Sequence, residues 1–184
     1  ITAHRINDPI LAENLLKEGK VDLVAMARPL IADPELPNKA REGRYDEIRM
    51  FIACNRCFDS LFDGKSITCL VNPDVGREKE YRIKKTENPK KVLIVGGGPG
   101  GMEAARVAFL RGHEVVLYEK SGELGGQINL IAACPEMKEF ENIPRYYKSQ
   151  LKGVRVELNA KVTPNSIPQE NPDVVIIATG ALPI

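Results

Sequence analysis

Three glycines with a defined spacing follow a short apolar run near the middle of the chain. Gly96, Gly98 and Gly101 fit the pattern G-x-G-x-x-G, and Glu119 follows roughly 20 residues later. Glycines at these positions permit a tight turn, the approach of a pyrophosphate to the backbone, and close contact between a helix and a strand. The first N–H groups of that helix and its dipole favour phosphate. The spacing therefore predicts a dinucleotide site in which Glu119 accepts hydrogen bonds from ribose hydroxyls.

The residues around these glycines read as a strand, a turn, a helix and a second strand. Residues 92–95 form a continuous apolar run, which is typical of a buried parallel strand. Alanines keep one face of the following helix small, Gly112 stands where a helix would end, and residues 114–118 form the next strand. An ordinary glycine-rich loop is the alternative, but it would not explain this order. Because the charge of Glu119 disfavours a 2′-phosphate, the bound nucleotide should be ADP-like rather than NADP-like.

Three of the four cysteines lie within one loop-rich stretch. Cys54 and Cys57 form a C-x2-C pair, and Cys69 follows after eleven intervening residues. Closely spaced thiolates beside a nucleotide-binding segment indicate a metal site, with these three as candidate ligands. The set is incomplete, because iron–sulfur clusters usually take four thiolates and structural zinc takes four nitrogen or sulfur ligands. An iron–sulfur cluster, a zinc site and reduced, partly buried thiols therefore stand as alternatives.

The composition argues against several classes of protein. The 184 residues carry a formal net charge of +1 with acids and bases interleaved, which argues against binding nucleic acid or a membrane surface through bulk charge. No apolar stretch approaches the length of a membrane span, and no signal-peptide pattern opens the sequence. The uneven cysteine spacing favours reduced or metal-bound thiols over a disulfide scaffold. We therefore expect a cytoplasmic protein, and its ends at Ile1 and Ile184 read as cut from a longer chain.

The first 50 residues read as helix, strand and helix. Asp8 and Pro9 are a good helix start, because Asp caps the first turn and Pro suits the first helical position. Residues 21–26 form a short apolar strand, and Asp33–Pro34 repeats the cap-and-proline signal before a second helix that runs to about residue 42. This order is typical of the last part of a (β/α)8 barrel, although it cannot close a barrel alone. We assign residues 1–50 to such a remnant.

The rest of the chain divides into three further segments. Residues 51–76 hold the cysteines, and residues 77–90 are a charged linker with a proline near its end. Residues 91–184 alternate strands and helices. Further elements are expected there at residues 138–151 (a helix interrupted at Pro144), 154–158 and 173–178. The sequence thus predicts an α/β protein made of a barrel remnant, a cysteine-rich loop and the first half of a Rossmann-like FAD- or ADP-binding domain.

Other motifs occur in a fixed order along nearly the whole chain. They are H-R-I-N-D-P at residues 4–9, D-L-V-A-M-A-R-P-L-I-A-D-P-E-L at 22–36, C-L-V-N-P at 69–73, L-G-G-Q at 124–127 and A-T-G at 178–180. Together with the glycine turn they resemble the family of 2,4-dienoyl-CoA reductases, enoate reductases and trimethylamine dehydrogenase. Members of this family join an old-yellow-enzyme-like FMN barrel to an iron–sulfur loop and then to FAD- and NAD(P)-binding domains. The chain resembles an internal fragment of such a protein.

The resemblance implies an FMN-phosphate site in the barrel remnant. In the family this phosphate lies at the ends of the seventh and eighth barrel strands, and the matching positions are Arg5, Ala27 and Arg28. A guanidinium makes bidentate, charge-assisted bonds to phosphate. Arg28 follows the predicted strand at the carboxyl face of the barrel, where such sites are found. A surface arginine is the alternative interpretation for both arginines.

The resemblance also implies a [4Fe–4S] cluster. Cys54, Cys57 and Cys69 match the last three ligands of the family pattern, and Phe51 occupies the position of the first. A phenylalanine cannot bind iron. Either one iron lacks its thiolate or no stable cluster forms, which brings into question the family's electron transfer from FAD through the cluster to FMN.

The resemblance assigns an FAD or ADP site to the third segment. Dienoyl-CoA reductases bind FAD there, whereas trimethylamine dehydrogenase keeps only ADP, and the L-G-G-Q motif favours FAD. The implied cofactor site begins with the tight turn at Gly96. The implied contacts are Gly98, Gly100 and Gly101 with the pyrophosphate, Glu119 with the ribose, Gln127 near the flavin, the Val162 backbone with the adenine, and Thr179 and Gly180 where the last strand closes over the cofactor.

These implications define the expected function. The parent protein would pass electrons from NAD(P)H through FAD and the cluster to FMN, and would reduce an activated C=C bond of a small molecule. The family's proton donor and substrate-binding residues lie outside these 184 residues, so no catalytic residue is assigned and the isolated chain is expected to be inactive. The alternatives are an ADP- or FAD-binding module without an electron relay, or one with a structural zinc site. Homo-oligomerisation stays open.

Overall fold

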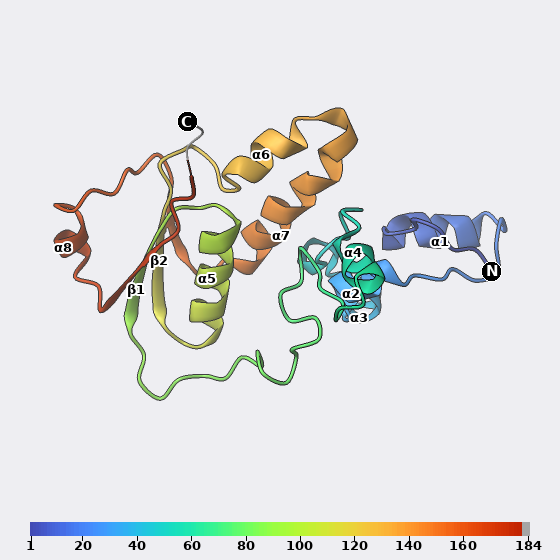
Figure 1. Ribbon diagram of the computed structural model, residues 1–184, viewed down its shortest axis with the longest axis horizontal. Coiled ribbons are helices and arrows are strands. Elements are labelled where there is room, and N and C mark those ends of the chain that lie inside the picture. Colours follow the sequence, from blue (N-terminus) through green and yellow to red (C-terminus); the bar gives the residue numbers. More distant parts are fainter. Residues whose placement is uncertain (182–184) are drawn as a thin grey trace. The chain divides into compact units, whose positions relative to one another are not determined.

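The computed structural model describes residues 1–181, which divide into two compact units (Figure 1). The first unit comprises Ile1–Tyr81, and the second begins at Arg82. Each unit has buried apolar residues of its own. Within the described residues, no helix combines the length and the apolar character needed to cross a membrane.

The first unit is built from short helices joined by loops. They are α1 (Pro9–Lys17), α2 (Arg28–Ala32), α3 (Leu36–Arg41), the 3-10 turn η1 (Tyr45–Glu47) and α4 (Arg56–Phe62). The predicted start of α1 is confirmed, because Pro9 is its first residue and the Asp8 carboxylate accepts a hydrogen bond from the Ile10 N–H at 2.8 Å. The helix α4 lies in the cysteine segment, where no helix was predicted.

The strand predicted at residues 21–26 is wrong. Only Val24 pairs, in a single parallel bridge to Thr2, with hydrogen bonds of 2.9 and 2.8 Å made by the Thr2 N–H and C=O. One bridge does not make a ladder, so the apolar run stays an extended loop.

The helix predicted behind Asp33–Pro34 is present as α3 and ends one residue before the expected residue 42, but it begins two residues after Pro34. Asp33 ends α2 in an extended conformation, with φ of −145°, and α3 begins only after Pro34. The Asp33 carboxylate is buried and makes contacts beyond the predicted cap. It accepts hydrogen bonds from the Glu35 N–H at 3.0 Å, the Arg49 N–H at 2.8 Å and the Lys39 ammonium at 2.6 Å.

The second unit contains a four-stranded, fully parallel sheet. Its strands are β1 (Lys91–Val95), β2 (Glu114–Tyr118), β3 (Arg155–Glu157) and β4 (Val174–Ile177), in the spatial order β3-β2-β1-β4. Each strand lies within one residue of its predicted bounds at either end. The predicted α/β class is therefore confirmed for this unit.

Helices cover the sheet on both faces. The helices α5 (Pro99–Leu110) and α7 (Asn142–Gln150) lie on one side, and the chain between β3 and β4, with α8 (Ile167–Glu170), lies on the other (Figure 1). Strand residues that alternate along β1 and β2, such as Ile94 and Leu117, are fully buried against α5. On the opposite face the Glu170 carboxylate accepts hydrogen bonds from Tyr118 and Arg155, which fastens the crossover to the sheet.

The segment between β2 and β3 holds the remaining helices. These are α6 (Gln127–Ala132), the 3-10 helix η2 (Pro135–Glu141) and α7. The interruption predicted at Pro144 is wrong, because Pro144 lies in the first turn of α7, where its missing N–H breaks no helical hydrogen bond. The break falls earlier, where η2 gives way to α7 at Asn142.

Candidate functional site

The glycine turn joins β1 to α5 at the carboxyl edge of the sheet. A Cβ atom at Gly96 would lie 2.3 Å from the Ala178 carbonyl oxygen, and one at Gly101 would lie 1.8 Å from the Gly96 carbonyl oxygen. Neither position therefore accepts a side chain, and Gly96 also has a φ of 112°. At Gly98 and Gly100, by contrast, an added Cβ would meet no atom within 4 Å. The turn is closed on its protein side and open at Gly98 and Gly100.

The open side of the turn coincides with the start of a long helix. Gly98 is the N-cap residue of α5, a helix of 12 residues. The first N–H groups of a helix have no partner within the helix, and the helix dipole places partial positive charge beside them. Here these are the N–H groups of Gly100 and Gly101, because Pro99 has none. An anion at Gly98 would therefore meet both donors and a favourable field.

Glu119 supplies a fixed negative charge beside the turn. One carboxylate oxygen accepts a hydrogen bond from the Gly97 N–H at 2.6 Å, and the other accepts from the Ser121 N–H at 2.8 Å and the Ser121 hydroxyl at 2.9 Å. Burial alone would raise the pKa of this carboxyl, but the donors of Ser121 and Gly97 outweigh it, so the pKa is lowered. The side chain is thus an ionised acceptor that is tied to the turn.

Two other loops reach the same edge of the sheet. The Gly125 N–H donates to the Gly97 carbonyl at 2.9 Å, which brings the L-G-G-Q loop against the turn. The side-chain amide of Gln127, the first residue of α6, donates to the Ala181 carbonyl at 2.8 Å, beyond Thr179 and Gly180. The glycine turn, Gln127 and the end of β4 therefore lie together.

The predicted adenine contact lies in the chain that follows β3. The Ala160 N–H donates to the Glu119 carbonyl at 2.9 Å, and Val162 follows two residues later, half-buried and outside any regular element. The structure thus leads this segment past Glu119.

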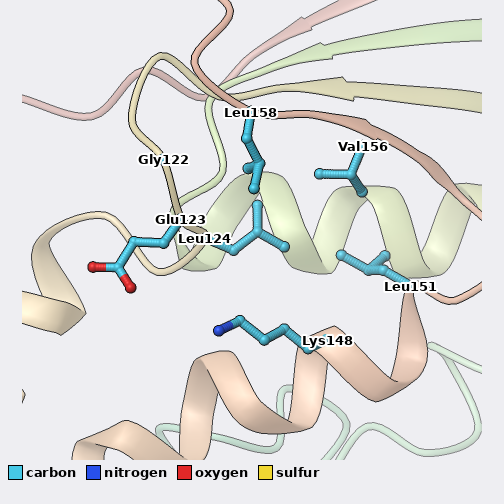
Figure 2. A pocket seen from close by; sticks show the side chains of 7 residues that line it. All are labelled: Gly122, Glu123, Leu124, Lys148, Leu151, Val156 and Leu158. Atoms are coloured by element: carbon cyan, nitrogen blue, oxygen red, sulfur yellow. The ribbon is translucent and has the colours of Figure 1, made fainter.

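A small cavity that no sequence pattern predicted lies between α7, β3 and the loop after Glu119. Its volume is about 200 Å³, and its lining is mostly apolar (Figure 2). Figure 2 shows the Lys148 side chain extending toward the side where Glu123 and Leu124 lie. The lining residues are Gly122, Glu123, Leu124, Lys148, Leu151, Val156 and Leu158. They come from several separate stretches, so no local spacing could have indicated the cavity.

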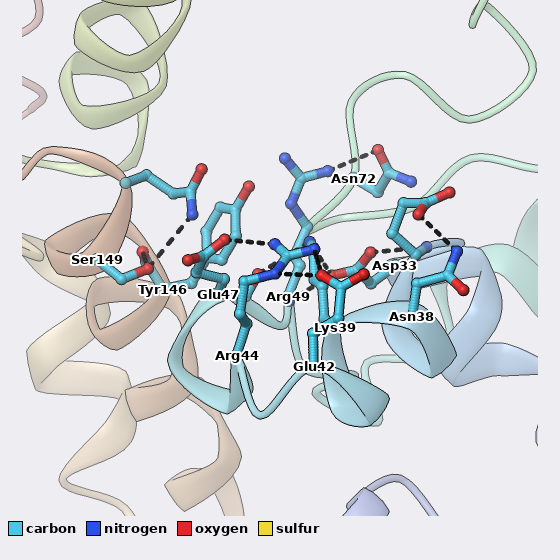
Figure 3. Close-up of polar contacts among 12 residues, drawn as sticks. Asp33, Asn38, Lys39, Glu42, Arg44, Glu47, Arg49, Asn72, Tyr146 and Ser149 are labelled. Atoms are coloured by element: carbon cyan, nitrogen blue, oxygen red, sulfur yellow. Dashed lines mark hydrogen bonds and ion pairs between the residues drawn. The ribbon is translucent and has the colours of Figure 1, made fainter.

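In the first unit, the cysteine loop is held by a buried polar network (Figure 3). The Arg49 guanidinium donates to the Asn72 side-chain oxygen at 2.7 Å, and the Asn72 amide donates to the Ile31 carbonyl at 2.9 Å. The Lys39 ammonium donates to the Asp33 carboxylate at 2.6 Å and to the Glu47 carbonyl at 2.9 Å. The chain just after Cys69 is therefore anchored to the helices of this unit.

The three candidate ligands are half-buried thiols. Burial raises the pKa of the Cys69 thiol, the N–H groups of Val71 and Asn72 oppose this, and the charges of Cys54 and Cys57 raise it further. The Cys69 thiol thus lies within electrostatic reach of Cys54 and Cys57. In the described part of the chain, however, no group of three or more His, Cys, Asp or Glu side chains is arranged to hold a metal ion.

The predicted FMN-phosphate residues line one cavity. Its volume is about 310 Å³, and it is bounded by residues 3–6 and 25–29 and by Phe51. Arg5 lies in the left-handed region with φ of 55°, and Arg28 is the first residue of α2 behind Ala27. The structure therefore brings Arg5, Ala27 and Arg28 together, and it adds Phe51 to the same wall.

Comparisons with known proteins match this architecture. Residues 1–47 match the NADH:flavin oxidoreductase / NADH oxidase family, and residues 91–172 match the FAD dependent oxidoreductases. A metal reductase of Desulforamulus reducens is 47% identical over the whole chain, and a cinnamate reductase of Clostridium sporogenes is 46% identical. The chain is a relative of these flavin oxidoreductases. The family resemblance predicted from the sequence is confirmed.

A solved structure extends the match to the fold. A complex of 2-naphthoyl-CoA reductase is 44% identical and superposes with a TM-score of 0.97 over 99% of the chain. The chain covers 28% of that protein, 29% of the metal reductase and 28% of the cinnamate reductase. It therefore spans less than a third of the length of the relatives it matches.

Phe51 stands where the expected ligand pattern has its first cysteine. Its side chain is 6% exposed, and its ring lies 4.9 Å from the Arg28 guanidinium carbon. The residue at the first cluster position is thus packed into the wall of the arginine cavity.

Proposed function

We propose that this chain is the part of an NAD(P)H-dependent flavin oxidoreductase that ends its FMN barrel and begins its FAD-binding domain. In this proposal residues 1–50 complete the barrel, residues 51–76 form the cysteine loop, residues 77–90 are the linker, and residues 91–184 hold the ADP half of FAD. The substrate is a small molecule with an activated C=C bond, of the enoate or dienoyl-CoA kind. Relatives named as reductases of cinnamate and 2-naphthoyl-CoA, and one named as an NADH oxidase, support this reaction class.

The strand order is the observation that carries the FAD site. The strand β1 lies between β2 and β4. From β1 the chain passes to β2 and β3 on one side of β1, and it then crosses back to β4 on the other side, so the strand order reverses at β1. Ligands of open parallel sheets bind beyond the carboxyl ends of the strands at such a switch point, as in Rossmann-like domains. The glycine turn and Glu119 follow β1 and β2 at that edge, and Thr179 follows β4 there.

The residues at this edge fit the ADP half of FAD. The open space at Gly98 and Gly100 admits a pyrophosphate next to the N–H groups of α5. The Glu119 carboxylate is ionised and accepts three hydrogen bonds from the protein, so about one of its roughly four acceptor positions is left for a ribose hydroxyl. Gln127 and Gly180 lie at the end of the proposed site where the flavin ring would be. When bound, FAD supplies hydride chemistry with the nicotinamide, and the protein supplies position and charge.

The residues of the first unit fit the phosphate of FMN. Arg28 and Arg5 provide two guanidinium groups to one cavity, and the small side chain of Ala27 leaves room for a ligand beside them. Guanidinium groups bind phosphate by paired, charge-assisted hydrogen bonds. The cavity position after the Val24 bridge agrees with the carboxyl face of a barrel strand.

The cysteine loop does not fit a four-thiolate cluster. Phe51 stands at the first ligand position with its ring against Arg28, and Cys54, Cys57 and Cys69 are not arranged around a metal. No step of the proposed reaction therefore passes through a cluster. This observation favours a second candidate, a flavin- or ADP-binding module without a cluster relay. A module with a structural zinc ion is the remaining alternative, although the same arrangement of the thiols does not favour it.

Metal and flavin analysis of protein purified without oxygen distinguishes these candidates. We expect FAD or ADP to be released on denaturation; a protein that holds neither after reconstitution contradicts the proposed site. Iron with acid-labile sulfide and a broad visible absorbance would support the relay, whereas zinc without colour would support the structural site. Phe51→Cys should raise the iron content on reconstitution if position 51 is the vacant ligand position. The isolated 184 residues should not oxidise NAD(P)H with an enoate.

A further inference from the structure

We propose that Phe51 and Phe58 are positioning residues that hold the Arg28 guanidinium ready for a phosphate in the adjoining cavity. The inference rests on the FMN-phosphate role of Arg28 proposed above. It assigns Phe51 a role in holding Arg28, whereas the ligand pattern indicates only that a cysteine is missing at this position.

Two aromatic rings and one amide surround the Arg28 guanidinium. Its central carbon lies 4.9 Å from the centroid of the Phe51 ring and 5.0 Å from that of the Phe58 ring. Both distances are within the range of a cation–π interaction. Its Nη1 donates to the Asn55 side-chain oxygen at 2.7 Å. The guanidinium is thus held from several directions.

This arrangement leaves Arg28 competent to bind an anion. A guanidinium carries five N–H donors, and contacts with ring faces use none of them. Asn55 takes up one donor, so the others are available to the cavity of about 310 Å³ that Arg28 and Phe51 line together. A long side chain that is already held loses less rotational freedom when it binds a ligand. The contacts of Phe51, Phe58 and Asn55 with the Arg28 guanidinium are called the clamp below. The clamp should therefore strengthen the binding of a phosphate and not of a ligand without one.

The clamp connects the cysteine loop to the phosphate cavity. Asn55 lies between Cys54 and Cys57, and Phe58 directly follows Cys57 at the start of α4. Asn55 holds a left-handed conformation with φ of 57°, which asparagine tolerates better than most residues. In the family pattern this loop would carry a metal. In this chain its residues Asn55 and Phe58 hold the guanidinium of Arg28.

The test compares FMN with riboflavin, which lacks only the phosphate, in the flavin-free full-length enzyme. Phe58→Leu is the main variant, because Phe58 is 39% exposed and its loss should leave folding intact. We expect it to weaken FMN binding about 2- to 5-fold, the size of one cation–π contact, with riboflavin binding unchanged. Phe51→Leu should act in the same direction, and Phe58→Tyr should restore the preference for FMN. Phe62→Leu is the matched control, since Phe62 is 84% exposed on the same helix and its ring stacks on Phe58 rather than on Arg28.

Arg28→Ala separates this inference from the proposed function. If Arg28→Ala abolishes the preference for FMN but neither phenylalanine variant changes it, the positioning role is overturned and the phosphate site stands. If Arg28→Ala leaves the preference intact, the phosphate site itself is wrong and the clamp falls with it. Equal losses for FMN and riboflavin in Phe58→Leu would show a merely structural role and would also overturn the inference.

Discussion

Replacing Gly98 with alanine tests the open side of the glycine turn without disturbing its closed side. The added Cβ would meet no protein atom within 4 Å, and the φ of −73° and ψ of 179° suit any residue. A compatible Gly→Ala change stabilises by about 0.4–1 kcal/mol through the unfolded chain. Alanine is a poorer N-cap residue than glycine by a similar amount, about 0.5–1 kcal/mol. The free energy of unfolding should therefore change by less than about 0.5 kcal/mol.

The same methyl group should obstruct a bound pyrophosphate. It would occupy the space through which the phosphates approach the N–H groups of Gly100 and Gly101. Forcing a methyl group into a packed contact costs about 1–3 kcal/mol. This corresponds to an increase in the Kd for FAD of about 5- to 150-fold.

The assay is a titration of flavin-free protein with FAD, followed by the quenching of flavin fluorescence, with thermal unfolding measured on the same samples. Gly122→Ala serves as the control, because its added Cβ would lie at an ordinary 3.4 Å from the Asn159 side chain and outside the turn. If Gly98→Ala binds FAD as the unchanged protein does, the turn does not contact the pyrophosphate. If Gly98→Ala lowers the Tm while Gly122→Ala does not, the reasoning about its open side is wrong.

Three further changes test other parts of the structure. Gly101→Ala should lower the free energy of unfolding by about 3 kcal/mol in a urea titration, because its Cβ would collide with the Gly96 carbonyl at 1.8 Å; an unchanged urea midpoint would contradict this packing. Lys39→Met removes the partner of the buried Asp33 carboxylate and should cost about 1–3 kcal/mol by the same measurement, and a smaller loss would mean that other donors suffice. The folded pKa of Glu119 is lowered, so its ionised form stabilises the fold above the unfolded pKa of about 4.3, and this contribution is lost as the pH falls through the folded pKa. Urea titrations at several pH values should thus show Glu119→Gln less stable near neutral pH and the difference shrinking in acid; a constant difference would exclude this linkage.

The second unit could be predicted closely because its signals are local. The apolar run of β1, the glycine turn and the strand that leads to Glu119 are contiguous, and each element follows the last along the chain. The order of the strands in the sheet could not be read from any one segment, since it depends on how the return to β4 crosses the sheet. The cavity beside Lys148 escaped prediction for the same reason.

The first unit was predicted less well because its signals are ambiguous without tertiary contacts. Asp33 before a proline reads as a helix cap, but its carboxylate also binds Lys39 and Arg49 from farther along the chain, and these contacts leave no trace in the local sequence. The apolar run that includes Val24 makes only a single bridge, to Thr2, within the described residues. Its strand propensity alone was therefore not enough to form a strand. The contact of Phe51 with Arg28 joins residues that no periodicity links.

The closed side of the glycine turn has a consequence for how a nucleotide would bind. Gly96 is wedged against Ala178, Gly101 lies under Gly96, and the Gly97 N–H is tied to Glu119. The turn therefore has its shape before a ligand arrives, and association requires no ordering step. Within residues 96–101, substitutions at the wedged glycines should change folding, whereas substitutions at Gly98 and Gly100 should change recognition. One short motif thus separates the residues that determine the fold from those that determine the ligand.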